Sequence, residues 1–96
     1  MLPADNSQLS HIFGDRPGHL PDTPANRQRL VDVANDRDNY RGVDKYGNKW
    51  FVEEGSDGNQ IWVTTRNGVI QNGGSNNPPL EWDENTGLNR NPFKKR

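Results

Sequence analysis

Two histidines carry the strongest chemical signal in this sequence. His11 and His19 flank the segment 12–18, and a histidine side chain exchanges protons near neutral pH, so that one imidazole can accept a proton while the other donates one. RNA cleavage needs both transfers, since a base removes the proton of the ribose 2′-hydroxyl and an acid protonates the leaving 5′-oxygen. The pair suits RNA cleavage by 2′-hydroxyl transesterification, but its spacing alone is a weak signal, because two histidines in one loop are more often structural residues.

The segment 60–66 is predicted as a strand and supplies further candidates. Alternation along a strand places Gln60, Trp62, Thr64 and Arg66 on one face. A guanidinium binds phosphate through paired hydrogen bonds, so Arg66 is the third predicted catalytic residue; the alternative is a surface arginine beside a turn. Trp62 either stacks on a base or lies beneath the N-terminal loop. We predict that Gln60, Trp62 and Thr64 bind substrate.

Three more side chains are predicted to bind substrate. Asn72 and Asn76 lie on either side of Gly73-Gly74, where their amides either contact a base edge or hold the loop. Thr86 is the third, in the closing segment Thr86-Gly87-Leu88. The chain has no cysteine and only two histidines, which excludes thiolate and all-histidine zinc sites. We expect no metal and no cofactor.

The composition is that of one small domain. Of the 96 residues, 28% are hydrophobic, and three Trp and three Phe supply large side chains for a thin core. Asn, Asp, Gly and Pro are abundant, which indicates many turns and short elements. No apolar run has the length of a membrane span, and the N-terminus lacks the basic and apolar regions of a signal peptide, so we expect neither.

Basic residues concentrate at the C-terminus. The last seven residues hold four of them, which leaves 8 basic and 13 acidic groups in residues 1–89. Such an acidic body does not bind nucleic acid unspecifically. The tail either contacts a polyanion or is a solubilising terminus. We expect a flexible segment at 1–10, a domain at 11–88 and a basic tail at 89–96.

The elements predicted to position these side chains are one helix and a meander. Pro24 suits the first helical position after a cap at Asp22 or Thr23, and the helix runs to about Asn35. The segment 11–22 before it is expected to be an ordered loop that carries both histidines. Beyond it, a period of two and the hairpin signals Asp57-Gly58 and Asn67-Gly68 predict strands at 43–46, 49–53, 60–66, 69–72 and 81–83, with a polar loop from Gly73.

These elements predict an α+β fold. An N-terminal loop and the helix pack on an antiparallel meander sheet of three to five strands. The helix covers the face of Ile61, Val63 and Thr65. The opposite face, with one large aromatic residue, an arginine and amides, is a poor core and is expected to be a binding surface.

Several motifs occur in a familiar order. They are His11-Ile12-Phe13, Pro17-Gly18-His19, Asp22-Thr23-Pro24-Ala25-Asn26-Arg27, Asp44-Lys45-Tyr46-Gly47-Asn48-Lys49-Trp50, Gln60-Ile61-Trp62-Val63 and Asn67-Gly68-Val69-Ile70-Gln71-Asn72-Gly73-Gly74. Over about residues 11–88 the chain resembles the C-terminal toxin domains of bacterial polymorphic toxins, including those of contact-dependent growth inhibition. The resemblance implies a ribonuclease of the barnase–EndoU–colicin–RelE fold. Catalytic residues vary among its members, so the roles given to His11, His19 and Arg66 rest on their chemistry.

The resemblance also implies a biological setting. The domain is expected to be delivered as part of a larger secreted or cell-surface toxin and to act in the cytoplasm of the target cell. Its substrate is expected to be RNA, above all transfer RNA, with a cognate immunity protein covering the active face and a host factor as a further partner. The alternative is a domain without catalytic activity that binds a protein through the open sheet face, which the acidic body slightly favours.

Overall fold

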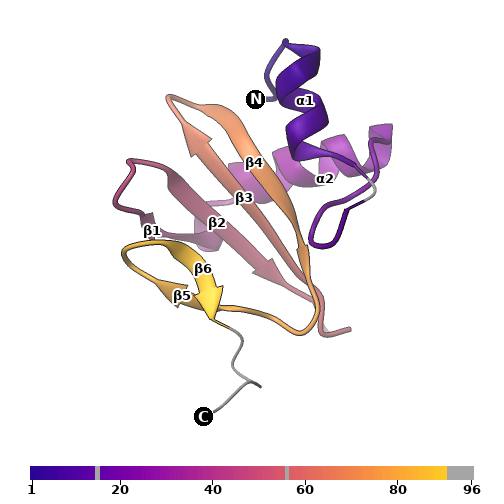
Figure 1. The fold of residues 1–96 in the computed structure, drawn as a ribbon. Helices are drawn as coiled ribbons and strands as arrows, with labels where there is room; N and C mark the ends of the chain where they lie inside the picture. Colours follow the sequence, from indigo (N-terminus) through magenta and orange to yellow (C-terminus); the bar gives the residue numbers. More distant parts are fainter. Residues whose placement is uncertain (15, 56, 91–96) are drawn as a thin grey trace.

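The fold is a helix-covered meander sheet with a second, smaller hairpin (Figure 1). The computed structural model describes residues 1–14, 16–55 and 57–90. Strands β1 to β4 form one antiparallel sheet in sequence order, and β5 pairs with β6 in a separate two-stranded sheet. The α+β prediction is confirmed. The elements are α1 (Asn6–Ile12), α2 (Pro24–Asn35), the 3-10 helix η1 (Arg37–Asn39), β1 (Tyr40–Val43), β2 (Lys49–Glu54), β3 (Gln60–Arg66), β4 (Val69–Asn76), β5 (Glu81–Asp83) and β6 (Gly87–Arg90).

Helix α2 has the predicted bounds because its ends are encoded locally. The Thr23 hydroxyl accepts the N–H of Asn26, and a proline occupies the first turn. Leu30 and Val33, three residues apart, are both buried. The helix therefore turns one apolar stripe toward the sheet.

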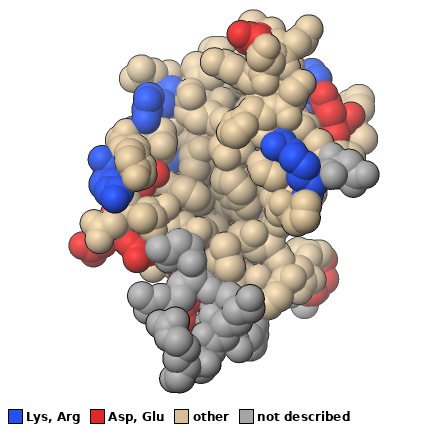
Figure 2. Space-filling model, in the orientation of Figure 1, with Lys and Arg blue, Asp and Glu red and all other residues tan. Residues whose placement is uncertain are grey.

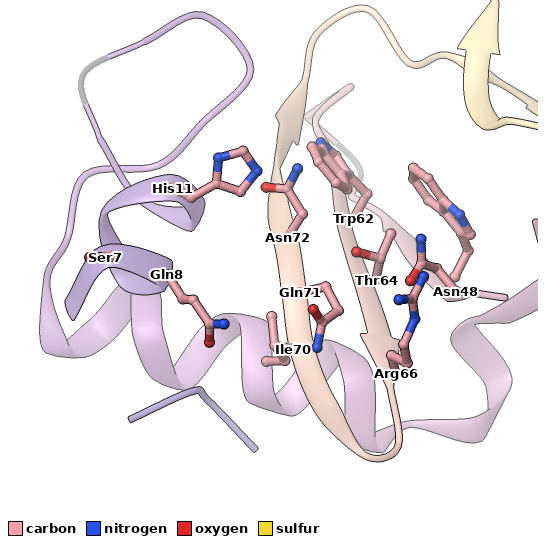
Figure 3. Close-up of a pocket in the computed structure, with 11 residues that line it drawn as sticks. Ser7, Gln8, His11, Asn48, Trp62, Thr64, Arg66, Ile70, Gln71 and Asn72 are labelled. Carbon is pink, nitrogen blue, oxygen red and sulfur yellow. The ribbon is translucent and has the colours of Figure 1, made fainter. Parts of the chain in front are cut away.

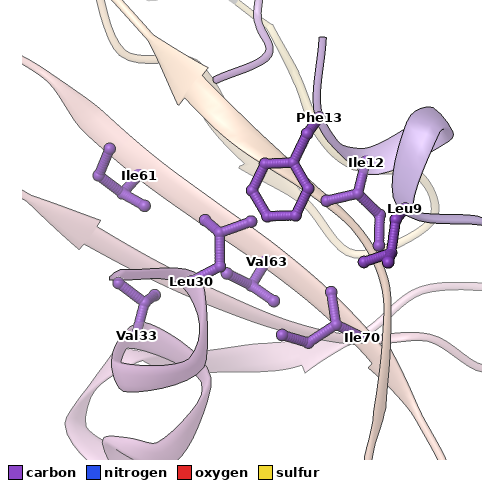
Figure 4. Packing of buried hydrophobic residues seen from close by; sticks show 8 residues of the cluster. All are labelled: Leu9, Ile12, Phe13, Leu30, Val33, Ile61, Val63 and Ile70. Carbon is purple, nitrogen blue, oxygen red and sulfur yellow. The ribbon is translucent and has the colours of Figure 1, made fainter. Parts of the chain in front are cut away.

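The core lies between α2 and one face of the sheet (Figure 4). Ile61 and Val63 alternate along β3 and point toward this core, as predicted. Phe51 pairs with Val63 in the neighbouring strand and packs against the same cluster. The buried cluster consists of Leu9, Ile12, Phe13, Leu30, Val33, Ile61, Val63 and Ile70.

The expected loose N-terminus is wrong, because residues 6–12 form helix α1. The Asp5 carboxylate caps it by accepting the N–H of Ser7. Leu9 and Ile12 lie on the same face and are buried in the core. Burial of these two side chains holds a short polar helix against the sheet. His11 is consequently a helical residue, whereas the sequence analysis placed it in a loop.

Strand β4 is longer than predicted and includes Gly73 and Gly74, which were assigned to a loop. A Cβ at Gly73 would lie 2.8 Å from a methyl group of Leu30, and one at Gly74 would overlap the carbonyl of Gly18. Glycine is present here because neighbouring groups approach the strand closely. Strand β1 also differs from the prediction, since it ends at Val43 and residues 45–47 form the turn into β2.

The β5–β6 hairpin packs on the sheet face opposite α2. The Trp82 ring meets the Trp50 ring edge to face at 6.1 Å. A Cβ on Gly42 would lie 2.9 Å from the Trp82 ring, and one on Gly87 would overlap the Trp50 ring. The face expected to be open is therefore open only in part.

The basic tail and a membrane-spanning helix are the remaining features to compare with the prediction. The basic tail predicted at 89–96 lies outside the described residues, apart from the last two backbone positions of β6. None of the helices in the described part of the chain combines the length and the apolar character needed to cross a membrane.

Candidate functional site

A cavity of about 540 Å³ opens between α1 and the uncovered part of the sheet (Figures 2 and 3). This volume is in the range of small-ligand sites. Side chains from α1, from the start of β2, from β3 and from β4 point into it. The lining residues, which we call the pocket, are Ser7, Gln8, His11, Asn48, Trp50, Trp62, Thr64, Arg66, Ile70, Gln71 and Asn72.

Five of the predicted site residues meet in this pocket. They come from three separate elements: His11 from α1, Trp62, Thr64 and Arg66 from β3, and Asn72 from β4. Alternation along β3 accounts for three of them, because every second side chain faces the pocket. The structure thus brings together five residues that are predicted one by one from the sequence.

A bulge in β4 adds a second amide side chain, that of Gln71, to the pocket beside Asn72. Asn72 pairs with Thr64, but the next residue of β3, Thr65, pairs with Ile70, which leaves Gln71 as the extra residue. Bulges redirect side chains and are frequent beside functional sites. Here the bulge brings the neighbouring side chains of Gln71 and Asn72 to the same pocket.

Two stacked indoles form the aromatic wall of the pocket. The Trp50 and Trp62 rings are 5.4 Å apart between centroids and inclined by 25°. The indole N–H of Trp50 donates to the Asp44 carboxylate at 2.8 Å. Because Trp50 is buried between this carboxylate, Trp62 and the β5–β6 hairpin, the wall is fixed before any ligand binds.

Asp44 is charged in this environment. Burial alone raises the pKa of Asp44, but the hydrogen bonds from the Trp50 indole and from the N–H groups of Asn48 and Tyr46 outweigh burial. The pKa of Asp44 therefore lies below its ordinary value. A buried anion thus organises both the turn at residues 44–48 and the indole behind the pocket.

The pocket favours anions, although the body of the protein is acidic. Its lining contains an arginine and a histidine and no carboxylate. Figure 2 shows Lys and Arg on both sides of the hollow, while the acidic side chains in this view lie toward the periphery. Arg66 donates one N–H to the Tyr46 carbonyl at 2.8 Å and is otherwise exposed. Its guanidinium keeps donors for a ligand such as a phosphate.

Polar groups beside Arg66 can orient a ligand. Thr64 is 4% exposed and lies in the pocket with its hydroxyl, a donor and an acceptor. The Asn72 carbonyl oxygen accepts the N–H of Gly73 at 2.9 Å, so its NH₂ group remains as a donor toward the pocket. These groups suit the hydroxyl, carbonyl and phosphate oxygens of a nucleotide.

His11 is held in place from outside the pocket. The Arg16 guanidinium donates to the backbone carbonyls of Ser10 and His11, at 3.1 and 2.6 Å. These bonds satisfy carbonyls at the end of α1, which lack partners within the helix. Arg16 therefore fixes the turn that carries the imidazole.

His19 does not line the pocket. Its Nδ1 lies 2.9 Å from the Ile12 carbonyl, and because a carbonyl only accepts, Nδ1 carries the proton and Nε2 is left as an acceptor in the neutral ring. Its ring meets Trp62 edge to face at 6.3 Å. The two predicted histidines thus differ in place: His11 lines the pocket, and His19 contacts the indole that forms its wall.

Three predicted substrate-binding residues lie outside the pocket. Gln60 is 1% exposed. Its side-chain NH₂ group donates to the Leu80 carbonyl and to the Glu54 carboxylate. Its side-chain oxygen accepts the backbone N–H of Leu80 and an N–H of the Asn76 amide. Gln60 and Asn76 are therefore not brought to the pocket, because their amides tie the segment before β5 to β3. Thr86 lies in the β5–β6 turn, where its N–H contacts the Asp83 carboxylate at 3.3 Å.

The other pocket residues are not predicted from the sequence. Ser7 and Gln8 belong to α1, whose signals are a cap at Asp5 and buried residues three apart. Asn48 precedes β2 and Trp50 lies in β2, and the sequence predicts only a turn and a strand there. No local signal marks the bulge that admits Gln71, because a bulge depends on the partner strand.

The chain was compared with known protein families, with curated proteins and with solved structures, and none of them matches it. Among the described residues, no three His, Cys, Asp or Glu side chains are grouped so that they could hold a metal ion. The candidate function therefore rests on the pocket itself.

Proposed function

We propose that this domain is an endoribonuclease toxin that cleaves RNA by 2′-hydroxyl transesterification without a metal. One observation carries the proposal. His11 and Arg66, far apart in the sequence, line one pocket that has an aromatic wall and no carboxylate. A proton-transfer group and a phosphate-binding cation are among the components that this reaction requires, and the aromatic wall offers a surface on which a base can stack.

Five of the pocket residues have a role in this reaction. The Arg66 guanidinium binds the scissile phosphate and stabilises the charge that grows on its oxygens in the transition state. His11 transfers one of the two protons, either from the 2′-hydroxyl or to the leaving 5′-oxygen. Trp62 contacts the base, and Thr64 and Asn72 hydrogen-bond the nucleotide.

The second proton transfer needs another group. His19 has an acceptor nitrogen that its bond to Ile12 does not use, and it contacts Trp62 at the edge of the pocket. We assign the second transfer to His19, as the sequence predicts, with the order of acid and base open. If His19 does not act, the Thr64 hydroxyl, which lines the pocket, is our candidate to replace it.

The proposal includes a partner and a setting. The domain acts on transfer RNA in the cytoplasm of a target bacterium after delivery within a larger secreted or cell-surface toxin, with a host factor as a further partner. A cognate immunity protein places acidic side chains against Arg66 and His11, where they imitate phosphate. A structure of that complex in which Trp62 and Arg66 stay exposed to solvent would contradict this mode of inhibition.

Incubation of the purified domain with total RNA and a chelator tests the activity. We expect discrete fragments that end in 2′,3′-cyclic phosphate, and far slower formation of the same fragments with His11→Ala. Intact RNA at high concentrations of the folded domain, both alone and with an extract of the target cell that supplies the host factor, would overturn the enzymatic proposal. It would leave the alternative, a domain without catalytic activity that binds a protein through the same face.

A further inference from the structure

The β1–β2 turn exposes an aromatic ring and a cation that the pocket does not use. The Tyr46 side chain is 64% exposed. The Lys45 ammonium lies 5.2 Å from the centroid of the Tyr46 ring, within the range of a cation–π contact. No other aromatic ring among the described residues contacts Tyr46, so one face of the ring is available for stacking.

This turn is rigid. The Asp44 carboxylate accepts the N–H of Tyr46 at 2.9 Å, and its carbonyl accepts the N–H of Gly47 at 3.1 Å. The Lys45 N–H donates to the Asn85 carbonyl in the β5–β6 turn at 2.9 Å. A ligand that binds Tyr46 therefore does not have to order the backbone that carries it.

The turn is also continuous with the pocket. Arg66, the proposed phosphate-binding residue, donates to the Tyr46 carbonyl at 2.8 Å. Asn48, two residues beyond Tyr46, is part of the pocket lining. A phosphate bound at Arg66 thus lies close to the backbone of Tyr46, and we expect the neighbouring nucleotide of the same strand to reach the exposed ring.

We propose that Tyr46 and Lys45 form a second nucleotide subsite for single-stranded RNA beside the scissile phosphate. The Tyr46 ring stacks on the neighbouring base, and the Lys45 ammonium neutralises a backbone phosphate. An exposed aromatic ring next to a cation is the usual composition of a single-strand binding surface. The inference rests on the proposed ribonuclease function and extends it, since it makes a base outside the pocket a determinant of cleavage.

The test uses a short RNA with one mapped cleavage position and matching RNAs with an abasic residue at each neighbouring position. For the wild-type domain, one abasic substitution should lower kcat/KM by about 5- to 100-fold, the usual contribution of one stacked base. Tyr46→Ala should lower kcat/KM on the intact RNA by a similar factor, and the same abasic substitution should then have no further effect. Tyr46→Phe should retain wild-type values.

Tyr40→Ala is the matched control, because Tyr40 is also exposed but packs against Phe51 on the other face of the sheet. It should leave the abasic effect unchanged. Equal sensitivity of the wild type and Tyr46→Ala to every abasic substitution would overturn the subsite while ribonuclease activity stands.

Fluorescence anisotropy with an uncleavable 2′-deoxy oligomer separates the two proposals. Binding that Tyr46→Ala weakens, in a domain that cleaves no RNA, would support the subsite and overturn the ribonuclease function. Binding that Tyr46→Ala leaves unchanged would overturn the subsite, whether or not RNA is cleaved.

Discussion

The indole N–H of Trp50 donates to the buried carboxylate of Asp44 at 2.8 Å, and the Trp50 ring stacks on Trp62. One carboxylate therefore connects the turn that presents Tyr46 with the wall of the pocket. The contribution of this connection to stability can be measured separately from any activity.

Asp44→Asn should lower the free energy of unfolding at pH 7 by about 1.5–3 kcal/mol, because hydrogen bonds to a charged acceptor are lost and a buried N–H is left without a partner. Urea denaturation monitored by tryptophan fluorescence measures this change. Asp57→Asn, at a carboxylate in an exposed turn, is the control and should change the free energy of unfolding far less.

The effect of Asp44→Asn should depend on pH in a defined direction. The pKa of Asp44 is lower in the folded than in the unfolded chain, so the ionised carboxylate contributes to the free energy of unfolding. This contribution is complete above the pKa of an aspartate in the unfolded chain, about 3.9, and is lost as the pH falls through the pKa of Asp44 in the folded chain. The difference between wild type and variant should be constant from about pH 5 upward and shrink below about pH 4. A difference that stays the same down to pH 2 would show that charge is not the cause.

His11→Ala should reduce RNA cleavage by about 10²- to 10⁴-fold, the range for loss of a positioned proton-transfer group. The fold should persist, because the imidazole is exposed and Leu9 and Ile12 hold the helix. Ser10→Ala changes an exposed residue of the same helix outside the pocket and should keep wild-type activity. Cleavage by a folded His11→Ala variant at the wild-type rate would exclude His11 from the mechanism.

His19→Ala distinguishes a second proton-transfer group from a residue that only supports Trp62. With two histidines in opposite protonation states, the wild-type rate should follow a bell-shaped pH profile, and His19→Ala should remove one limb of it together with about 10²-fold or more of the rate. Replacement of both histidines should cost little more than the worse single replacement. If His19→Ala keeps the bell-shaped pH profile and its rate falls only a few fold, His19 is a positioning residue.

Arg66→Ala should lower kcat/KM by about 10²- to 10³-fold, as expected for removal of one donor that stabilises transition-state charge. Arg66→Lys should recover only part of this loss, because an ammonium cannot form the paired hydrogen bonds of a guanidinium. Arg29→Ala is a suitable control, since Arg29 pairs with Glu53 on an exposed surface away from the pocket. Full activity of Arg66→Lys would indicate that charge alone is required.

The parts of this protein that depend on neighbours in the sequence could be predicted. Helix α2 has the predicted bounds because Thr23 and Pro24 supply its first turn. Strand β3 also has the predicted bounds, and its alternation alone places Trp62, Thr64 and Arg66 on the face opposite Ile61 and Val63. Such patterns follow from backbone geometry and persist in any packing.

Only the tertiary structure determines which of the predicted site residues lie together in the pocket. Helix α1 is stable because Leu9 and Ile12 are buried against other elements, and the polar sequence around them gives little sign of this. The bulge that turns Gln71 into the pocket exists only relative to β3, and the burial of Gln60 follows from the segment that folds over it. A site built from side chains of several elements depends on contacts between distant segments, and these contacts, unlike the alternation of a strand, leave no period in the sequence.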